Sequence, residues 1–506
     1  MNRTTLSLIA AGSALAVVTG VAALTAPDGG TDGGAKAAAQ RPVERSSLLC
    51  PAPSTSDLAE TAYTSFTPKS SEGSDGKGSA ELIGAARESN DDGKADKDDK
   101  GKGKGEKGGE DRPVLTPKEP GKPVTGEASG AEAPALIGSA GGALAPGWTV
   151  QQTTKVTAGG GRGLLGVTCN TPDTDFWFPA ASTAKERSDY VHLTNPDDTA
   201  AVVDIELYGP QGALKSEVGE DIQVPPHSSV PVLLSTLTEQ PQANVTAHVT
   251  ARTGRIGASV QAMDDKIGGD WLPASADPSG SVVLPGIPKD ATSVRLVAFA
   301  PGEDDADLKV SLAGPSGSIT PAGNETLHVK SGMTAAVDLG DVTKGEPGSL
   351  VLTPTEESTP VVAALRVTRG KGAKQETAFI PATGALAKRA TAADNRAKGS
   401  TLSLVAPGKT AKVRVTASAG ADGGTSTSKT YTVKGGTTMA VEPPVPNGVK
   451  GSYALTVERV SGTVYAARTL ELPQDGVPMF TLQTLPDDRG TVAVPDAEQD
   501  LSVLQK

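Results

Sequence analysis

The sequence predicts an all-β protein: three tandem immunoglobulin-like β-sandwich domains that follow an N-terminal membrane segment and a disordered charged insert. Three observations carry this prediction. From about Trp148, short runs alternate apolar and polar residues and are broken by Gly, Pro, Asn and Asp, as in strands. The runs recur with a period close to the roughly 100 residues of one sandwich. A charged, biased stretch precedes them, and the chain begins with an apolar run.

The N-terminus has the pattern of an export signal. Arg3 is followed by the uncharged run Leu6–Leu24, and a short basic head before an apolar run is typical of a signal peptide or a signal anchor. The run is close to the ~20 residues that span a bilayer, so cleaved and uncleaved forms both remain open. We therefore interpret residues 1–26 as a signal peptide or anchor and residues 27–44, rich in Gly and Ala, as a flexible spacer.

A biased segment follows the extended N-terminal segment 45–68. Residues 69–146 are predicted to be a disordered low-complexity insert, because the run from Asp91 to Arg112 is rich in acids and bases and nearly free of apolar residues. Such a run buries too little surface to offset the entropy of ordering. On this interpretation, deleting residues 72–145 should leave the folded part intact.

The repeats define the domain bounds. Pro196, Pro301 and Pro407 occupy matching places in three copies, 105 and 106 residues apart. The predicted sandwiches are residues 147–275 with an N-terminal extension, 276–385 and 386–486, and residues 487–506 form a tail. Each copy also adjoins an apolar-Pro-Ala element: FWFPAAS, DWLPAS and AFIPAT. An alternative is one continuous β architecture in which neighbouring units share these elements.

Charge and motifs exclude several function classes. A net charge of −12 and a pI near 5.0 argue against a nucleic-acid partner, which would require a basic stripe. The GxGxxG pattern at Gly161–Gly166 lacks the strand-turn-helix context of a dinucleotide site, so we interpret it as a glycine-rich turn. No catalytic residue, metal ligand or cofactor-binding residue is predicted, and the protein is expected not to be an enzyme.

The histidines and tryptophans are candidates for residues of a metal or sugar site. The four histidines lie apart without metal-ligand spacing, and His192 and His248 are expected to point to solvent from strands. Trp177 and Trp271 hold equivalent places beside the repeats, which favours shared packing over a platform for sugars.

Cys50 and Cys169 are the two cysteines of the chain. Cys50 has Leu49 where a lipid-modified cysteine needs a small residue, and neither cysteine has a nearby histidine for metal binding or thiol catalysis. Two cysteines in an exported chain usually pair. The sequence therefore predicts a Cys50–Cys169 disulfide.

Several stretches together, CP at Cys50, FWFPA, ERSDYVHLTNPDDTAAVVDIELYGPQG and GRIGASVQA before DWLPAS, resemble a family of secreted or membrane-anchored actinobacterial proteins of unknown function. The resemblance implies an extracytoplasmic protein of the cell envelope and carries no catalytic residue. The expected role is a non-enzymatic spacer or protein-interaction scaffold, secreted or anchored in the plasma membrane by its N-terminal helix alone. The expected partner is a cell-envelope protein or glycan. The alternatives are an accessory subunit of a membrane envelope-assembly enzyme and a carbohydrate-binding or glycoside-acting protein.

Overall fold

The computed structural model describes residues 39–69, 77–87, 113–216 and 218–494, and this part of the chain is all-β, which confirms the predicted class. Its helices are two short 3-10 turns, Leu234–Thr236 (η1) and Gly372–Lys374 (η2). Within these residues, no helix has the length and apolarity that crossing a bilayer requires. The predicted signal peptide or anchor, residues 1–26, lies outside the described residues.

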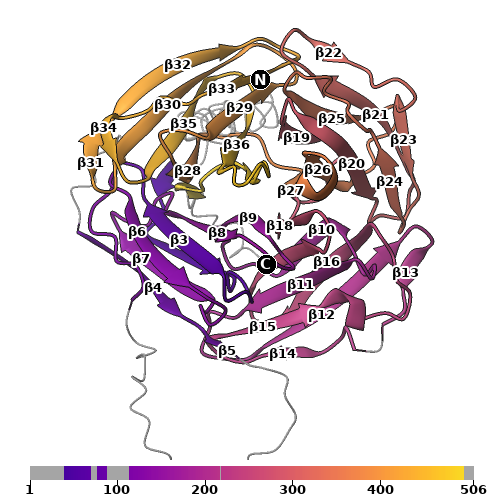
Figure 1. Cartoon of the computed structure of the whole chain (residues 1–506), viewed down its shortest axis with the longest axis horizontal. Coiled ribbons are helices and arrows are strands. Elements are labelled where there is room, and N and C mark those ends of the chain that lie inside the picture. Colours follow the sequence, from indigo (N-terminus) through magenta and orange to yellow (C-terminus); the bar gives the residue numbers. More distant parts are fainter. Residues whose placement is uncertain (1–38, 70–76, 88–112, 217, 495–506) are drawn as a thin grey trace, which may run out of the picture. The chain divides into compact units, whose positions relative to one another are not determined.

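The strands between Pro42 and Thr491 form four consecutive pairs of sheets, each enclosing its own hydrophobic cluster (Figure 1). The first pair joins sheet β2-β7-β4 to sheet β6-β3-β8-β9: Arg45–Cys50 (β2), Ala59–Phe66 (β3), Gly78–Gly84 (β4), Val124–Ser129 (β6), Leu136–Gly142 (β7), Thr149–Val156 (β8) and Gly163–Thr168 (β9).

The second pair joins sheet β10-β16-β12-β13, with β14 on β12, to sheet β18-β17-β11-β15-β5: Ala86–Arg87 (β5), Asp175–Ala181 (β10), Arg187–Thr194 (β11), Ala201–Gly209 (β12), Gly212–Leu214 (β13), Ile222–Val224 (β14), Ser228–Leu233 (β15), Val245–Thr253 (β16), Gly257–Asp264 (β17) and Gly268–Leu272 (β18).

The third pair joins sheet β19-β25-β21-β22, with β23 on β21, to sheet β24-β20-β26-β27: Val282–Ile287 (β19), Ala291–Phe299 (β20), Ala306–Ala313 (β21), Ser318–Ile319 (β22), Thr326–Val329 (β23), Thr334–Asp338 (β24), Gly348–Pro354 (β25), Val362–Arg369 (β26) and Glu376–Pro381 (β27).

The fourth pair joins sheet β28-β35-β30-β31-β34, with β32 on β30, to sheet β33-β29-β36-β37: Arg389–Asn395 (β28), Ser400–Ala406 (β29), Ala411–Gly420 (β30), Gly423–Thr425 (β31), Thr427–Val433 (β32), Thr437–Val441 (β33), Asn447–Lys450 (β34), Tyr453–Ser461 (β35), Tyr465–Glu471 (β36) and Phe480–Thr484 (β37).

Alternation along the strands builds these cores. In β21, Leu308 and Val310 are buried while Asp307 and Lys309 are exposed, because successive side chains of a strand point to opposite faces. The same period recurs in β30, where Val413 alternates with exposed neighbours. Each sheet therefore presents one apolar face to its partner sheet.

The structure differs from the sequence prediction at the N-terminal end. The predicted disordered insert, residues 69–146, contributes β4, β5, β6 and β7, and the segment 45–68 contributes β2 and β3. With β8 and β9 they form a complete sheet pair, so the count of three sandwiches is wrong and the predicted first domain, 147–275, combines the end of one pair with the next. Small residues explain the difference: β7 reads LIGSAGG and β4 reads GSAELIG, which have little of the β-branched and aromatic content of typical strands.

The strand order is not that of an immunoglobulin domain. In that fold the first two strands are neighbours in one sheet. Here the first strand of the third pair, β19, hydrogen-bonds to β25, whereas the second strand, β20, lies in the other sheet between β24 and β26. The second and fourth pairs repeat this order with β10 and β11 and with β28 and β29.

The last strand of each pair, which we call its closing strand (β9, β18, β27 and β37), also packs against a neighbouring pair. Trp271 of β18 clusters with residues of the first pair, Phe379 of β27 lies in the core of the second pair, and Phe480 of β37 lies in the core of the third. Leu164 of β9 in turn packs with Leu470 and Met479 of the fourth pair. The contacts therefore run in a closed cycle, and the apolar-Pro-Ala elements of β18 and β27 are shared between neighbours.

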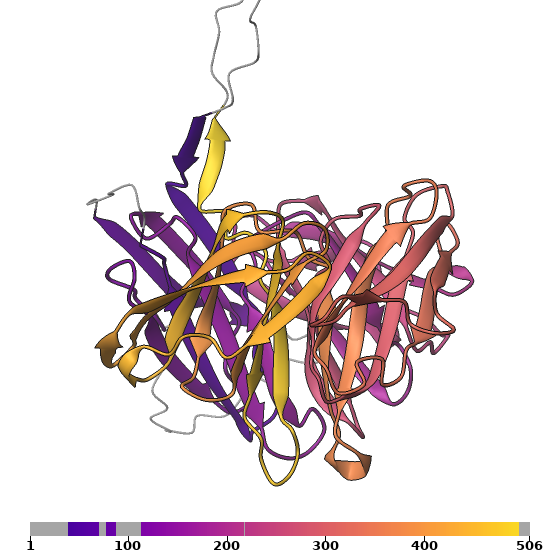
Figure 2. The ribbon, with the colours of Figure 1, turned by 90° about the horizontal axis from the view of Figure 1, so that it is seen from above.

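The two ends of this body lie together, because the backbone N–H of Val43 donates to the carbonyl of Gly490. Ala39–Pro42 (β1) and Thr491–Val494 (β38), drawn in indigo and yellow in Figure 2, pair with each other as a two-stranded sheet. Two predictions are corrected here: part of the predicted spacer 27–44 and part of the predicted unstructured tail 487–506 are strands. Residues 27–38 and 495–506 lie outside the described residues.

Candidate functional site

A polar groove of about 420 Å³ lies between sheet β6-β3-β8-β9 of the first pair and two segments of the fourth pair. Strand β28 of the fourth pair packs against β3 and β8 beside it (Figure 1). The groove is lined by Glu60, Thr61, Ala62, Glu127, Ala128, Ser129, Thr153, Lys155, Leu164, Arg396 and Leu472. The groove is therefore built where the first sheet pair meets the fourth.

Strand register brings most of these side chains onto one face. Glu60 lies opposite both Ser129 and Lys155, and Ala62 lies opposite both Glu127 and Thr153. Residues directly opposite each other in antiparallel strands point to the same face of the sheet. The sheet thus presents rows of polar and small residues to the groove.

The groove carries opposite charges on its two sides. The acids Glu60 and Glu127 belong to β3 and β6, while Lys155 belongs to β8 and Arg396 follows β28. Among the described residues, no ion pair joins Glu60, Glu127 or Lys155 to another side chain. These three charges are therefore available to a ligand.

Arg396 is held from behind by a buried carboxylate. Its Nε donates to Oδ1 of Asp394 at 3.1 Å, and the Thr153 hydroxyl donates to Oδ2 of the same carboxylate at 2.8 Å. The Asp394 backbone N–H donates to Oε1 of Gln151, and the Asp394 side chain is fully buried. The guanidinium, about one-third exposed, is thus fixed in direction before any ligand arrives.

A cluster of buried polar groups lies behind Asp394. Arg468 on β36 is fully buried, and its three side-chain nitrogens make no hydrogen bond to the described residues. Burial lowers the pKa of Arg468 to about 10, and the nearby charge of Asp394 acts in the opposite direction. Gln483 pairs with Arg468 across β36 and β37 and is also buried.

Two buried acids connect the closing strands. Oε1 of Glu376 accepts from the Leu164 N–H at 3.1 Å, and Oδ1 of Asp270 accepts from the Gly166 N–H at 2.8 Å. Burial raises the pKa of Glu376 to about 8 and raises the pKa of Asp270 well above its ordinary value, to which the Glu376 charge adds. Both side chains are enclosed rather than exposed in a cleft.

The glycine pattern at residues 161–166 serves this junction. At Gly163, a Cβ would lie 2.5 Å from both Oε1 of Glu376 and the carbonyl oxygen of Gly269, so a side chain does not fit. A strand, β9, follows the glycines where a dinucleotide site requires a helix. The glycines permit close approach of the closing strands.

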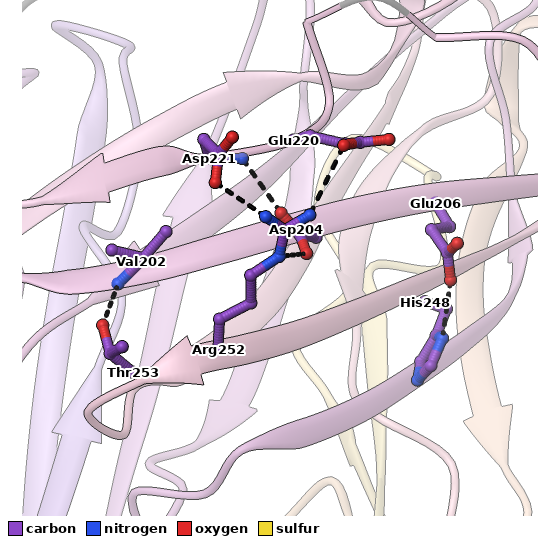
Figure 3. Close-up of polar contacts among 8 residues, drawn as sticks. All are labelled: Val202, Asp204, Glu206, Glu220, Asp221, His248, Arg252 and Thr253. Carbon is purple, nitrogen blue, oxygen red and sulfur yellow. Dashed lines mark hydrogen bonds and ion pairs between the residues drawn. The ribbon is translucent and has the colours of Figure 1, made fainter.

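The charged cluster on the second pair, in contrast, is held together by its own ion pairs (Figure 3). Arg252 contacts the carboxylates of Asp204, Asp221 and Glu220, with 2.8 Å between its Nη1 and Oδ1 of Asp221. His248 contacts Glu206 in the same view. One guanidinium joins three carboxylates from neighbouring segments, so the cluster stabilises strand pairing and keeps an excess of negative charge.

The predictions for the histidines and tryptophans have mixed outcomes. His192 is buried and the His248 side chain is only 13% exposed, so the prediction that they point to solvent is wrong. The His248 ring stacks on Trp177 with centroids 3.5 Å apart, and this contact removes both rings from solvent. Trp177 and Trp271 are both buried, as the packing interpretation predicted. Among the described residues, no three metal-ligating side chains come together.

The predicted disulfide between Cys50 and Cys169 is present and spans a sequence separation of 119. It joins the end of β2 to the residue after β9, and both cysteines belong to the core of the first pair. The disulfide therefore closes the segment that contains the charged insert.

Sequence reasoning missed the groove residues. The stretch TVQQTTKVT has the alternation of a strand, and its polar face, with Gln151, Thr153 and Lys155, is a signal that this side meets polar partners. The partner Arg396 could not be identified, because the two sides of the groove are far apart in the chain.

A protein-family model matches the chain. Residues 124–444, more than half of the chain, match the family model described as "Family of unknown function (DUF5719)". No curated protein matches the sequence. The match covers the third sheet pair, the second apart from β5, and parts of the first and fourth, so the chain belongs to the DUF5719 family of unknown function.

Proposed function

We propose that this chain is a non-enzymatic extracytoplasmic protein of the cell envelope that acts as a protein-interaction scaffold. The buried disulfide supports an oxidising compartment, because such bonds persist mainly outside the cytosol. The apolar run Leu6–Leu24 supports either secretion or anchoring in the plasma membrane through this segment alone.

The observation that carries the proposal is the hydrogen bond between Val43 and Gly490. A spacer separates what is attached to its two ends, and it therefore needs those ends far apart. Here the chain enters and leaves the body at one place. This geometry favours a scaffold over a spacer. In a scaffold, the body can be attached at this one place and its other surfaces can contact partners.

The alternatives differ in their support. An accessory subunit of a membrane envelope-assembly enzyme is compatible with the same geometry, since it too requires a tethered head with an interaction surface. A carbohydrate-binding or glycoside-acting protein gains no support from Trp177 or Trp271, which are 8% and 0% exposed and present no platform to a sugar.

Photo-crosslinking in intact cells tests the proposal. A crosslinking residue is introduced at exposed positions on different sheet pairs, Ser129, Lys309 and Val460, and the captured proteins are identified after membrane isolation. We expect at least one position to capture a defined envelope protein while the others do not. Products at no position, or the same mixture at all three, would contradict a scaffold. Protease protection in whole cells would contradict the extracytoplasmic location.

A further inference from the structure

The groove has a charge polarity that defines the chemistry of its occupant. Passing across the sheet from β6 to β8, the side chains change from Glu127 and Glu60 to Lys155, with Arg396 on the basic side. Within the described part of the chain, the two acids and the lysine have no ion-pair partner. A ligand with a positive and a negative group would satisfy both sides.

The strand spacing sets the distance between those groups. Neighbouring strands lie about 4.8 Å apart, so β6 and β8, which flank β3, are about 10 Å apart. An extended peptide advances roughly 3.3–3.6 Å per residue. About three residues therefore bridge Glu127 on β6 and Lys155 on β8, whereas Glu60, on β3, lies directly opposite Lys155.

The remaining lining suits a small peptide. Ala62 leaves space on the groove face of the sheet, and Leu164 and Leu472 supply an apolar contact. A volume of 420 Å³ falls within the range of about 300–1,000 Å³ typical of small-molecule sites.

We propose that this groove binds a short extended peptide of about three residues, with its ammonium group toward Glu127 on β6 and its carboxylate toward Lys155 and Arg396. Arg396 is suited to the carboxylate, because a planar guanidinium forms paired hydrogen bonds with it and Asp394 already fixes its direction. The inference rests on the proposed function and supplies a ligand class for the scaffold.

Calorimetric titration of the purified full chain with trialanine tests the inference. Three matched probes are N-acetylated trialanine, trialanine amide and the doubly blocked peptide. We expect trialanine to bind and each single block to weaken binding about tenfold, the effect of losing one charge-assisted contact of about 1.4 kcal/mol. Equal binding of the doubly blocked peptide, or no heat from trialanine at millimolar concentration, would overturn the proposal.

Two variants test which end of the peptide contacts which residue of the groove. Lys155→Met removes the charge and keeps the apolar stem, and it should weaken trialanine about tenfold while leaving the affinity for trialanine amide unchanged. Glu127→Gln should likewise weaken trialanine about tenfold, and it should leave the affinity for N-acetylated trialanine unchanged, because that peptide has no ammonium group. Lys309→Met, at an exposed position on β21, is the matched control and should bind like the parent. Loss of affinity in the control equal to that of Lys155→Met would overturn the assignment.

Thermal melts accompany each titration. If Lys155→Met melts below the control, Glu127→Gln alone decides the assignment. The two proposals fail separately. If crosslinks form but trialanine does not bind, peptide binding in the groove is refuted and the scaffold function stands. If trialanine binds but no crosslinks form, the scaffold function is refuted and peptide binding stands.

Discussion

The guanidinium of Arg369, on β26 of the third sheet pair, lies over the ring of Phe480, on β37 of the fourth, with 4.7 Å from its carbon to the ring centroid. The same relationship joins Arg187 of the second pair to Phe379 of the third at 5.4 Å. In both cases a cation of one pair covers an aromatic ring supplied by the next, which adds to the apolar burial of that ring. The core of each of these pairs is thus completed by a residue from its successor.

Phe480→Ala should destabilise the body by about 3–5 kcal/mol, because a fully buried ring is lost and a cavity remains. Denaturant unfolding followed by tryptophan fluorescence measures the change. Ile319→Ala, at a residue 57% exposed, is the control and should change stability little. Equal unfolding midpoints for the two variants would contradict the shared core.

Glu376 should make the protein less stable as pH rises. Its pKa of about 8 in the folded state exceeds its ordinary value near 4.5, so between these pH values the folded state retains a proton that the unfolded chain has released. Stability therefore falls from about pH 5 to pH 8, and Asp270 acts in the same direction.

Glu376→Gln should flatten this fall and should stabilise the protein most at pH 8, because the amide does not ionise. Melting temperatures at pH 5, 6.5 and 8 test this expectation, with Glu357→Gln at an exposed position as the control. A variant whose melting temperature falls with pH as steeply as that of the parent would refute this role for Glu376.

Cys50→Ser with Cys169→Ser should lower stability markedly. The chain-entropy model assigns roughly 4–5 kcal/mol to a bond that closes a loop of this length. Guanidinium unfolding of the parent with and without reductant should reproduce the difference between parent and double variant. Thiol labelling of the unfolded, unreduced parent should find no free cysteine. Two labelled thiols per chain would show that the disulfide is absent.

Deletion of residues 72–145 should unfold the first sheet pair, which reverses the expectation from sequence. The deletion removes β4, β6 and β7 together with the buried Leu82 and Leu136. Deletion of residues 90–110 alone, which spares every described strand, is the control and should leave the melting temperature unchanged. If the variant lacking residues 72–145 melted at the same temperature as the full-length protein, the structure of the first pair would be contradicted.

The fold was predictable wherever alternation was strong and the repeat was regular. Strands such as β12 and β21 carry β-branched or large apolar residues at every second position, and their copies lie at a constant spacing. The disulfide was predictable because the chain has two cysteines and neither has a histidine nearby in the sequence for metal binding or thiol catalysis. The first pair was missed because its small-residue strands are interrupted by the charged run, so local propensity gave little signal there.

The groove depends on contacts that local sequence does not encode. Thr153 and Asp394, which together fix Arg396, are 241 residues apart. Their neighbours, such as Lys155, read as ordinary exposed positions of a strand. Only the closure of the last sheet pair onto the first turns these residues into one site.

The closed cycle of sheet pairs also constrains how the chain is made and how it can diverge. As the chain is synthesised from its N-terminus, Leu164 emerges more than 300 residues before Met479, its partner across the closure. The first and third pairs therefore keep an incomplete neighbour contact until the fourth pair has formed. An open solenoid can gain or lose a repeat at its end. Here a duplication or loss would leave a closing strand with no core to enter, so the number of repeats is locked by the architecture.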